Sequence, residues 1–207
     1  TVPAGIVNSS FIGNYAKSET GEAAAGAIYT NQNLMLAAKD GYTSIISGNY
    51  VEDINGKRNE AIYVGEQAEL GFEATSNGQF VIDDMINGTD GYSVSFSGDE
   101  TGVVYLNNKI TAEPLPASST EEVSTSTETQ TPRVNISMSD ITLNLGQDNF
   151  IDNNNLTLNS GNVNMINNQA GVSALNSMTV TGDVNFVADV DLANESMDRF
   201  TANTYGE

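Results

Sequence analysis

The chain contains no cysteine, no histidine and no tryptophan. The absence of cysteine excludes disulfides and thiol chemistry, and with no histidine either it excludes the usual structural zinc sites. The absence of histidine also excludes imidazole acid–base catalysis and a protease triad of the usual form. No apolar run approaches the roughly 20 residues that a membrane-spanning helix needs, so we expect no membrane-spanning segment.

Basic residues are also scarce, because seven Lys and Arg stand against 27 Asp and Glu, for a formal net charge of −20. Proteins that bind nucleic acids neutralise phosphates with basic groups, and anionic membrane surfaces attract the same groups. We therefore expect neither nucleic acid nor a membrane surface as a partner. A cation, a basic partner or simple solubility fits this charge better.

Asparagine and glycine are abundant, with 26 and 19 copies. Both residues tolerate left-handed backbone conformations and tight turns. Between them lie short runs in which apolar and polar residues alternate, as at Leu156 and Leu158. A period of two is typical of strands with one buried face, so the sequence predicts an all-β chain with many tight turns.

Short words in the N-terminal half return after about 35 residues. Gly-Asn-Tyr at 13–15 returns at 48–50, and Ala-Ile-Tyr at 27–29 returns at 61–63, with a weaker echo that ends at Tyr105. In a coil of strands, residues at equivalent corners of successive windings stack on each other. The pairs expected to be equivalent are Tyr15 with Tyr50, Ile28 with Ile62, Leu34 with Leu70, Leu36 with Phe72, Ile45 with Ile82 and Asn49 with Asn87.

The C-terminal half has its own repeats. Segments 141–150, 156–165 and 178–186 align with one gap, at shifts of 15 and then 21–22 residues. Short strands at periods near 20 or 35 favour a parallel β-helix, or β-solenoid, over an antiparallel β-sandwich, which gives no reason for recurring words. The chain is therefore predicted to have two solenoid blocks, at 1–110 and 134–207.

Between these blocks lies a different composition. Residues 111–133 hold ten Ser and Thr and three of the four prolines. Such a segment cannot bury enough apolar surface to offset its ordering entropy, so we interpret it as a linker or insertion. For the C-terminal end we expect one more winding with Val190 and Leu192 inside, then a loop; the alternative is a helical turn over 195–200 capped by Asn194.

The N-terminal words resemble the passenger repeats of Gram-negative autotransporters, and especially the F-x-x-N and G-G-A-I words of polymorphic outer-membrane proteins. Phe11-Ile12-Gly13-Asn14 matches the first word, and Ala25-Gly26-Ala27-Ile28 matches the second except at Ala25. The second copies depart further, with Ile46 in place of Phe and Glu60 in place of a Gly. The resemblance implies a right-handed β-helix that is exported and displayed on, or shed from, the bacterial outer surface.

The resulting functional hypothesis is a non-enzymatic surface or secreted passenger with a structural or adhesive role. Its expected partners are copies of itself, adjacent windings of a solenoid, and a host or matrix ligand. Two alternatives stay open, namely a β-helix enzyme that degrades polysaccharides and a calcium-stabilised matrix protein. The tyrosine sets Tyr15/Tyr50 and Tyr29/Tyr63/Tyr105 fit stacking at corners better than a strip that binds carbohydrate.

No residue is singled out as catalytic, cofactor-binding or metal-ligating. A glycosidase needs two carboxylates facing one cleft, and the pairs Asp83/Asp84 and Asp189/Asp191 are expected instead to be solvated charges on the outer face. Calcium prefers oxygen ligands, and two sets of side chains could form casual sites. These sets are Asp148 and Asp152 with Asn153–Asn155, and Asp189 and Asp191 with Asp198.

Overall fold

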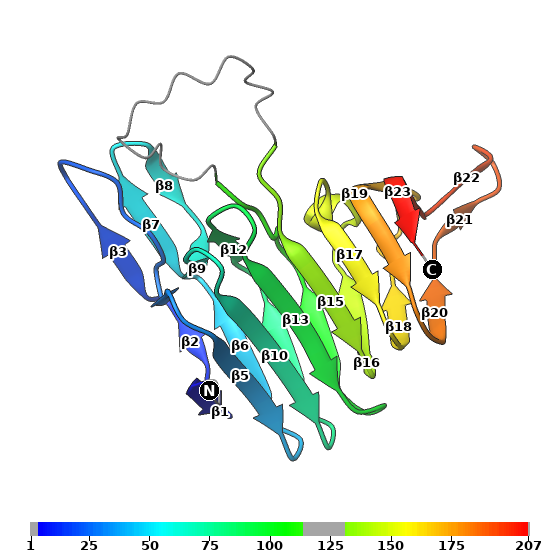
Figure 1. Ribbon diagram of the computed structural model, residues 1–207, viewed down its shortest axis with the longest axis horizontal. Coiled ribbons are helices and arrows are strands. Elements are labelled where there is room, and N and C mark those ends of the chain that lie inside the picture. Colours follow the sequence, from blue (N-terminus) through cyan, green and yellow to red (C-terminus); the bar gives the residue numbers. More distant parts are fainter. Residues whose placement is uncertain (1–3, 114–130, 207) are drawn as a thin grey trace.

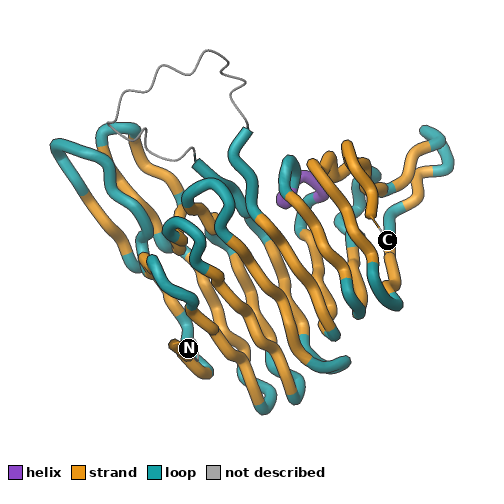
Figure 2. The backbone as a smooth tube through the Cα atoms, viewed as in Figure 1, coloured by secondary structure: helices purple, strands orange, loops and turns teal. Residues whose placement is uncertain are grey.

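A computed structural model describes residues 4–113 and 131–206, and these residues form an all-β structure, as predicted (Figures 1 and 2). One 3-10 turn, η1 (Asp148–Ile151), is the helical element within the described ranges. Most of the predicted linker at 111–133 lies outside the described residues. The chain makes successive passes, and each pass adds a strand to each of two long parallel sheets.

The larger sheet has eight strands, and every neighbouring pair is parallel. Their spatial order is β1 (Ala4–Val7), β5 (Leu34–Lys39), β10 (Glu69–Thr75), β13 (Ser93–Gly98), β15 (Asn135–Ser139), β17 (Asn155–Leu158), β19 (Val172–Val180) and β23 (Arg199–Gly206). Spatial order follows chain order, so each pass lies on the previous one.

The second sheet has seven strands and is also parallel throughout. Its order is β2 (Phe11–Ile12), β6 (Thr43–Ser47), β11 (Gln79–Ile82), β14 (Val103–Leu106), β16 (Ile141–Leu145), β18 (Gly161–Asn164) and β20 (Val184–Val187). The strands of the two sheets alternate along the chain, which is compatible with the expected solenoid.

Three small sheets complete the structure. The first is parallel and contains β4 (Ile28–Thr30), β9 (Glu60–Val64) and β12 (Met85–Gly88). The second joins β3 (Tyr15–Lys17), β7 (Tyr50–Asp53) and β8 (Gly56–Arg58), with β7 and β8 antiparallel. The third is the antiparallel pair β21 (Val190–Asp191) and β22 (Ser196–Met197).

The core consists of columns of apolar side chains that face inward from successive strands. One column of the larger sheet runs through Leu36, Phe72, Phe96, Met138 and Leu158, all 2% exposed or less. Because side chains alternate between the two faces of a strand, the polar residues between them face outward. The buried core therefore extends from β5 to β19, and the strands at either end pack against it with partly buried side chains.

Several predicted equivalences in the N-terminal half are confirmed. Tyr15 pairs with Tyr50, and their rings stack with centroids 5.4 Å apart. The other confirmed pairs are Ile28 with Ile62, Leu34 with Leu70, and Leu36 with Phe72. These confirmations show that the repeated words mark residues stacked in consecutive passes.

Three N-terminal predictions are wrong. Ile82 pairs with Ile46 and not with Ile45, which faces outward in the adjacent position. Asn49 is not equivalent to Asn87, which belongs to β12 in a different sheet; its side chain donates instead to Asp84. Tyr105 lies in β14 of the second sheet, between Val81 and Asn144, and so does not join Tyr29 and Tyr63. In each case the same residue type occurs more than once nearby or in another strand, as with the adjacent Ile45 and Ile46, so residue type alone did not fix the alignment.

The predicted shift of 15 residues in the C-terminal half is also wrong. Segment 141–150 begins in the second sheet, where Asn144 pairs with Asn164, whereas the partner of Leu156 is Ile136 in the larger sheet. The true shift here is 20 residues. The equivalence of Leu156 with Met178 is confirmed. Two alternating strands of one pass look alike in sequence, and this similarity produced the false alignment.

The C-terminal end differs from both sequence interpretations. Val190 is 61% exposed and Leu192 is 86% exposed, because they belong to an antiparallel hairpin that projects from the stack (Figure 1). No helical turn forms over 195–200. The chain then returns as β23, which pairs with β19.

The two long sheets continue without interruption across the Ser/Thr-rich segment. β13 precedes that segment and pairs directly with β15, which follows it. In the same way, β14 pairs with β16. The described residues on either side of the segment therefore share one pair of sheets and one core.

Candidate functional site

A pocket of about 350 Å³ lies where three irregular parts of the chain meet. It is lined by Glu22, Ala23, Ala24, Asn55, Arg58, Tyr63 and Glu113. The loop between β3 and β4, the β7–β8 hairpin and strand β9 contribute most of these residues. A larger hollow of about 790 Å³ lies beside the projecting β21–β22 hairpin. The smaller pocket is the better candidate because a network of buried charges supports it.

Among the described residues, the one cation that lines this pocket is Arg58, which the β7–β8 hairpin positions. The turn of this hairpin consists of Ile54 and Asn55, and Gly56, the first residue of β8, has φ of 102°, a backbone conformation that favours glycine. The Asn55 backbone N–H donates to the Asp53 carboxylate, as in an Asx turn. The antiparallel pairing then places Arg58 opposite Val51, with its side chain next to Asp53.

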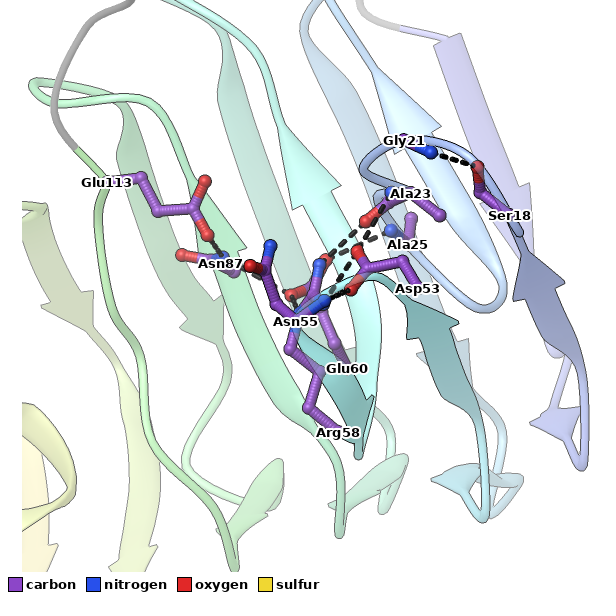
Figure 3. A network of polar contacts seen from close by, with 10 residues as sticks. All are labelled: Ser18, Gly21, Ala23, Ala25, Asp53, Asn55, Arg58, Glu60, Asn87 and Glu113. Atoms are coloured by element: carbon purple, nitrogen blue, oxygen red, sulfur yellow. Dashed lines mark hydrogen bonds and ion pairs between the residues drawn. The ribbon is translucent and has the colours of Figure 1, made fainter.

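Arg58 is held by three acceptors (Figure 3). Its Nε donates to Glu60 at 2.9 Å, its Nη1 to Asp53 at 2.9 Å, and its Nη2 to the Ala23 carbonyl at 2.6 Å. The side chains of Asp53 and Glu60 are fully shielded from solvent, whereas that of Arg58 is 29% exposed. The guanidinium therefore pairs with two carboxylates that are shielded from solvent. It also holds the loop between β3 and β4 in place through the Ala23 carbonyl.

The network extends from Glu60 across the next pass of the chain. Glu60 accepts hydrogen bonds from the Ala25 backbone N–H at 3.0 Å and from Asn87 Nδ2 at 3.2 Å. Asn87 Nδ2 also donates to Glu113 at 2.7 Å, and Asn87 Oδ1 accepts from the Thr111 hydroxyl at 3.0 Å. The side chain of Glu113 is thus positioned by a buried amide (Figure 3).

These contacts shift the pKa values of the site. The pKa of Asp53 falls to about 2, mainly because the Ala23 N–H donates to its carboxylate, with smaller effects from Arg58 and Asn55. Burial acts to lower the pKa of Arg58, but its bonds to Asp53 and Glu60 outweigh burial and raise it. Burial, followed by the charge of Glu113, raises the pKa of Tyr63 to about 12.

Tyr63 adds an aromatic side chain to the lining of the pocket. The Tyr63 ring stacks on that of Tyr29, with centroids 5.6 Å apart and planes inclined by 3°. The Arg58 guanidinium bonds the carboxylates of Asp53 and Glu60, and two further carboxylates, Glu22 and Glu113, line the pocket. The pocket therefore combines acceptors, an aromatic face and a net negative charge, a combination that suits binding of a polar ligand.

The sequence did not single out Arg58, Glu60, Asn87 or Glu113. The available signal was the Asp-Ile-Asn-Gly-Lys-Arg run at 53–58, because Asn-Gly between polar residues predicts a tight hairpin. Such a hairpin interrupts the repeat and brings its two flanking charges together. The contacts to Glu60 and Asn87 depend on how three passes stack and could not be read from spacing alone.

The structure separates the first predicted acidic pair. Asp83 is partly exposed and accepts a hydrogen bond from Asn107. Asp84 is 2% exposed and accepts from the backbone N–H groups of Gly48 and Asn49 and from the Asn49 side chain. The prediction that both are solvated charges is therefore wrong for Asp84, which satisfies donors at a corner between passes.

The two predicted calcium sets are rearranged. Asp148 of the first set lies with Asp189 and Asp198 of the second, and Asn167 bridges Asp148 and Asp189 through hydrogen bonds to both. Burial is the main cause that raises the pKa of Asp148, followed by the charge of Asp198.

The remaining members lie apart. Asp152 accepts from the backbone of Ala174, and Asp191 accepts from Asn194 in its own hairpin. Asn154 is buried and bonds the backbone of Val134 and Ile110. Over residues 4–113 and 131–206, no group of three or more acidic side chains is placed to hold a metal ion.

Comparisons with protein-family models, with curated proteins and with solved structures found no match to this chain. In the described part of the chain, no helix is long and apolar enough to cross a membrane. The functional interpretation therefore depends on the residues and contacts above.

Proposed function

We propose that this chain is a non-enzymatic passenger of a bacterial surface or secreted protein, folded as a right-handed parallel β-helix with a structural or adhesive role. The observation that carries the proposal is the in-register parallel pairing of eight strands in one sheet and seven in the other. At about 4.8 Å per strand, seven steps extend the larger sheet over about 34 Å. An elongated stack of this kind holds a surface at a distance from its anchor.

The stacking of the family-like words supports this interpretation. Phe11 of the first F-x-x-N word pairs with Ile46 of its second copy. The Asn14 side chain and backbone both donate to Asn49 Oδ1, at 2.9 and 3.0 Å. The word thus has a physical role, because its asparagine joins one pass to the next at a tight corner.

The outward face of the second sheet supports an adhesive, self-associating role. Across six strands it presents two columns of side chains without a charged group, in a chain of net charge −20. The columns are Thr43, Gln79, Val103, Thr142, Asn162 and Asn185, and Ile45, Val81, Tyr105, Asn144, Asn164 and Val187. Two copies meet least electrostatic repulsion across such a face.

Asparagine side chains also connect the strands of this face. Asn164 donates to Asn144 at 2.8 Å, and Asn185 donates to Asn162 at 3.1 Å. Ladders of this type hold outward side chains in a regular array and occur where sheets associate.

The proposal is tested by displaying the chain on a bacterial surface and measuring cell aggregation, together with light scattering of the purified chain over a concentration series. We expect aggregation, and a mass that rises above 21.9 kDa with concentration. The double variant Asn144→Asp/Asn164→Asp should abolish both effects, whereas Ser137→Asp on the outer face of β15 should not. A monomer at every concentration, with cells that neither aggregate nor adhere, would reject the proposal.

A further inference from the structure

The pocket beside Arg58 has an excess of negative charge at its rim. Of the residues that the structure describes, Arg58 is the only basic one that lines it, and its guanidinium already bonds Asp53 and Glu60. Glu22 and Glu113 form no ion pair within residues 4–113 and 131–206. The charge that would complement this rim is therefore positive.

The pocket also offers contacts for an alkyl chain. The small side chains of Ala23 and Ala24 line one part of it, and the ring of Tyr63 lines another. An ammonium group near an aromatic face gains a cation–π interaction, and methylene groups gain contact with the same ring. A volume of about 350 Å³ lies at the lower end of the range for small-ligand pockets.

The supporting network holds these groups in place before any ligand arrives. Asn87 fixes the Glu113 carboxylate, and Arg58 fixes the loop that carries Glu22 through its bond to the Ala23 carbonyl. Tyr63 is held against Tyr29 by ring stacking. A site whose groups are already ordered loses less entropy on binding.

We propose that this pocket binds an alkylammonium group, as carried by a lysine side chain or a small polyamine. Glu22 and Glu113 accept its N–H donors, and Tyr63 packs against its chain. This inference goes beyond the proposed structural or adhesive role, because the isolated chain would bind the ligand whether or not it associates with itself. The net charge of −20 raises the local concentration of cations around the molecule but does not by itself select this site.

The test is a calorimetric titration of the whole chain with two probes, 1,4-diaminobutane and Nα-acetyl-lysine methylamide. The Nε-acetylated lysine derivative, which has no charge, is the ligand control. We expect saturable binding of at least one charged probe and none of the acetylated form. Binding of the diamine alone would assign a free polyamine, and binding of both would assign the lysine side chain as well; either result supports the proposal.

Two variants and a matched control locate the site. Glu22→Gln changes an exposed side chain and should leave the fold intact, and Glu113→Gln removes the second carboxylate. Each should raise the Kd about tenfold or more. Glu100→Gln makes the same charge change in the exposed turn between β13 and β14, and its Kd should stay within about twofold of the parent.

Two results would overturn the proposal. If Glu100→Gln weakened binding as much as Glu22→Gln, the attraction would come from the overall charge and not from the pocket. If the acetylated probe bound as well as the charged one, the ammonium group would not be recognised. Circular dichroism of each variant confirms that the sheets remain folded in these comparisons.

Discussion

Replacement of Phe72 by alanine should destabilise the chain more than any equivalent change near the end of the stack. Phe72 is fully buried, its ring stacks on Phe96 at a centroid distance of 5.5 Å, and it meets the edge of Phe80 at 5.2 Å. These contacts join neighbouring passes of the larger sheet to the second sheet. The cavity left by alanine would therefore open at the centre of the shared core.

The magnitude follows from the burial of the ring. A phenylalanine buries roughly 200 Å², and at about 25 cal/mol per Å² this corresponds to about 5 kcal/mol as an upper bound. Core replacements of Phe by Ala cost about 3–5 kcal/mol. Phe72→Leu should cost only about 1 kcal/mol, because leucine already occupies the next position of this column at Leu36.

The measurement is guanidinium unfolding followed by circular dichroism, with the slope of the transition compared between variants. The matched control is Phe186→Ala, because Phe186 is 45% exposed in β20 near the end of the second sheet. Its loss should cost about 1–2 kcal/mol. Equal costs for Phe72→Ala and Phe186→Ala would refute the reasoning, since the two sheets would then not enclose one continuous core.

Three further predictions concern titration and close packing. Asp148→Asn should raise the free energy of unfolding at pH 7 but not at pH 3, because the raised pKa of Asp148 makes its ionised form unfavourable; guanidinium unfolding at both pH values tests this. The Tyr63 phenol should titrate near pH 12, and its contribution to stability should be complete below pH 10 and lost as the pH rises to 12. The pKa of Tyr92 is raised as well, so an absorbance titration of Tyr63→Phe should show the high-pH step reduced by one tyrosine, and an unchanged amplitude would contradict this. Gly78→Ala should cost about 2 kcal/mol or more, because its Cβ would collide with the Ala38 carbonyl, whereas Gly5→Ala, with open space around it, should change the unfolding midpoint little.

The sequence predicts the all-β class and the stacking of several residue pairs because alternation and repeated words have direct physical causes. The words at 13–15 and 48–50 recur because Tyr15 stacks on Tyr50 and Asn14 bonds Asn49 in consecutive passes. Two residues that make a specific contact, such as ring stacking or a side-chain hydrogen bond, are more informative than an apolar residue that can pack against many neighbours. This difference explains why the tyrosine pairs were identified correctly and Ile45 was not.

Register is harder to predict because neighbouring residues of one type, such as Ile45 and Ile46, and the two alternating strands of one pass look alike in sequence. The register is set at the turns, where backbone segments of neighbouring passes approach each other closely. At Gly78, Gly98 and Gly102, a Cβ atom would lie within about 2 Å of a carbonyl oxygen in the neighbouring pass, so only glycine fits. A single sequence does not distinguish these glycines from those in open turns.

The candidate site was not predicted because it lies in the segments that interrupt the repeat. Arg58 belongs to a hairpin that extends from β7, and Ala23 belongs to the long loop between β3 and β4. Their meeting with Glu60 depends on the paths of two irregular segments around a regular stack. The burial of Asp84 had a weak signal, since Asn14, Asn49 and Asp84 recur at intervals of 35 residues.

Because β13 pairs directly with β15 and β14 pairs directly with β16, the part of the sequence between Glu113 and Arg133 is a natural place for insertions. The strands on either side already meet in register, so added residues contribute only loop-closure entropy, which rises by about 0.6 kcal/mol for each doubling of length. A peptide tag or a whole binding module can therefore be inserted in this part of the sequence while both sheets keep their pairing. The same tolerance would let this part of the sequence diversify during evolution, while the paired strands on either side stay constant.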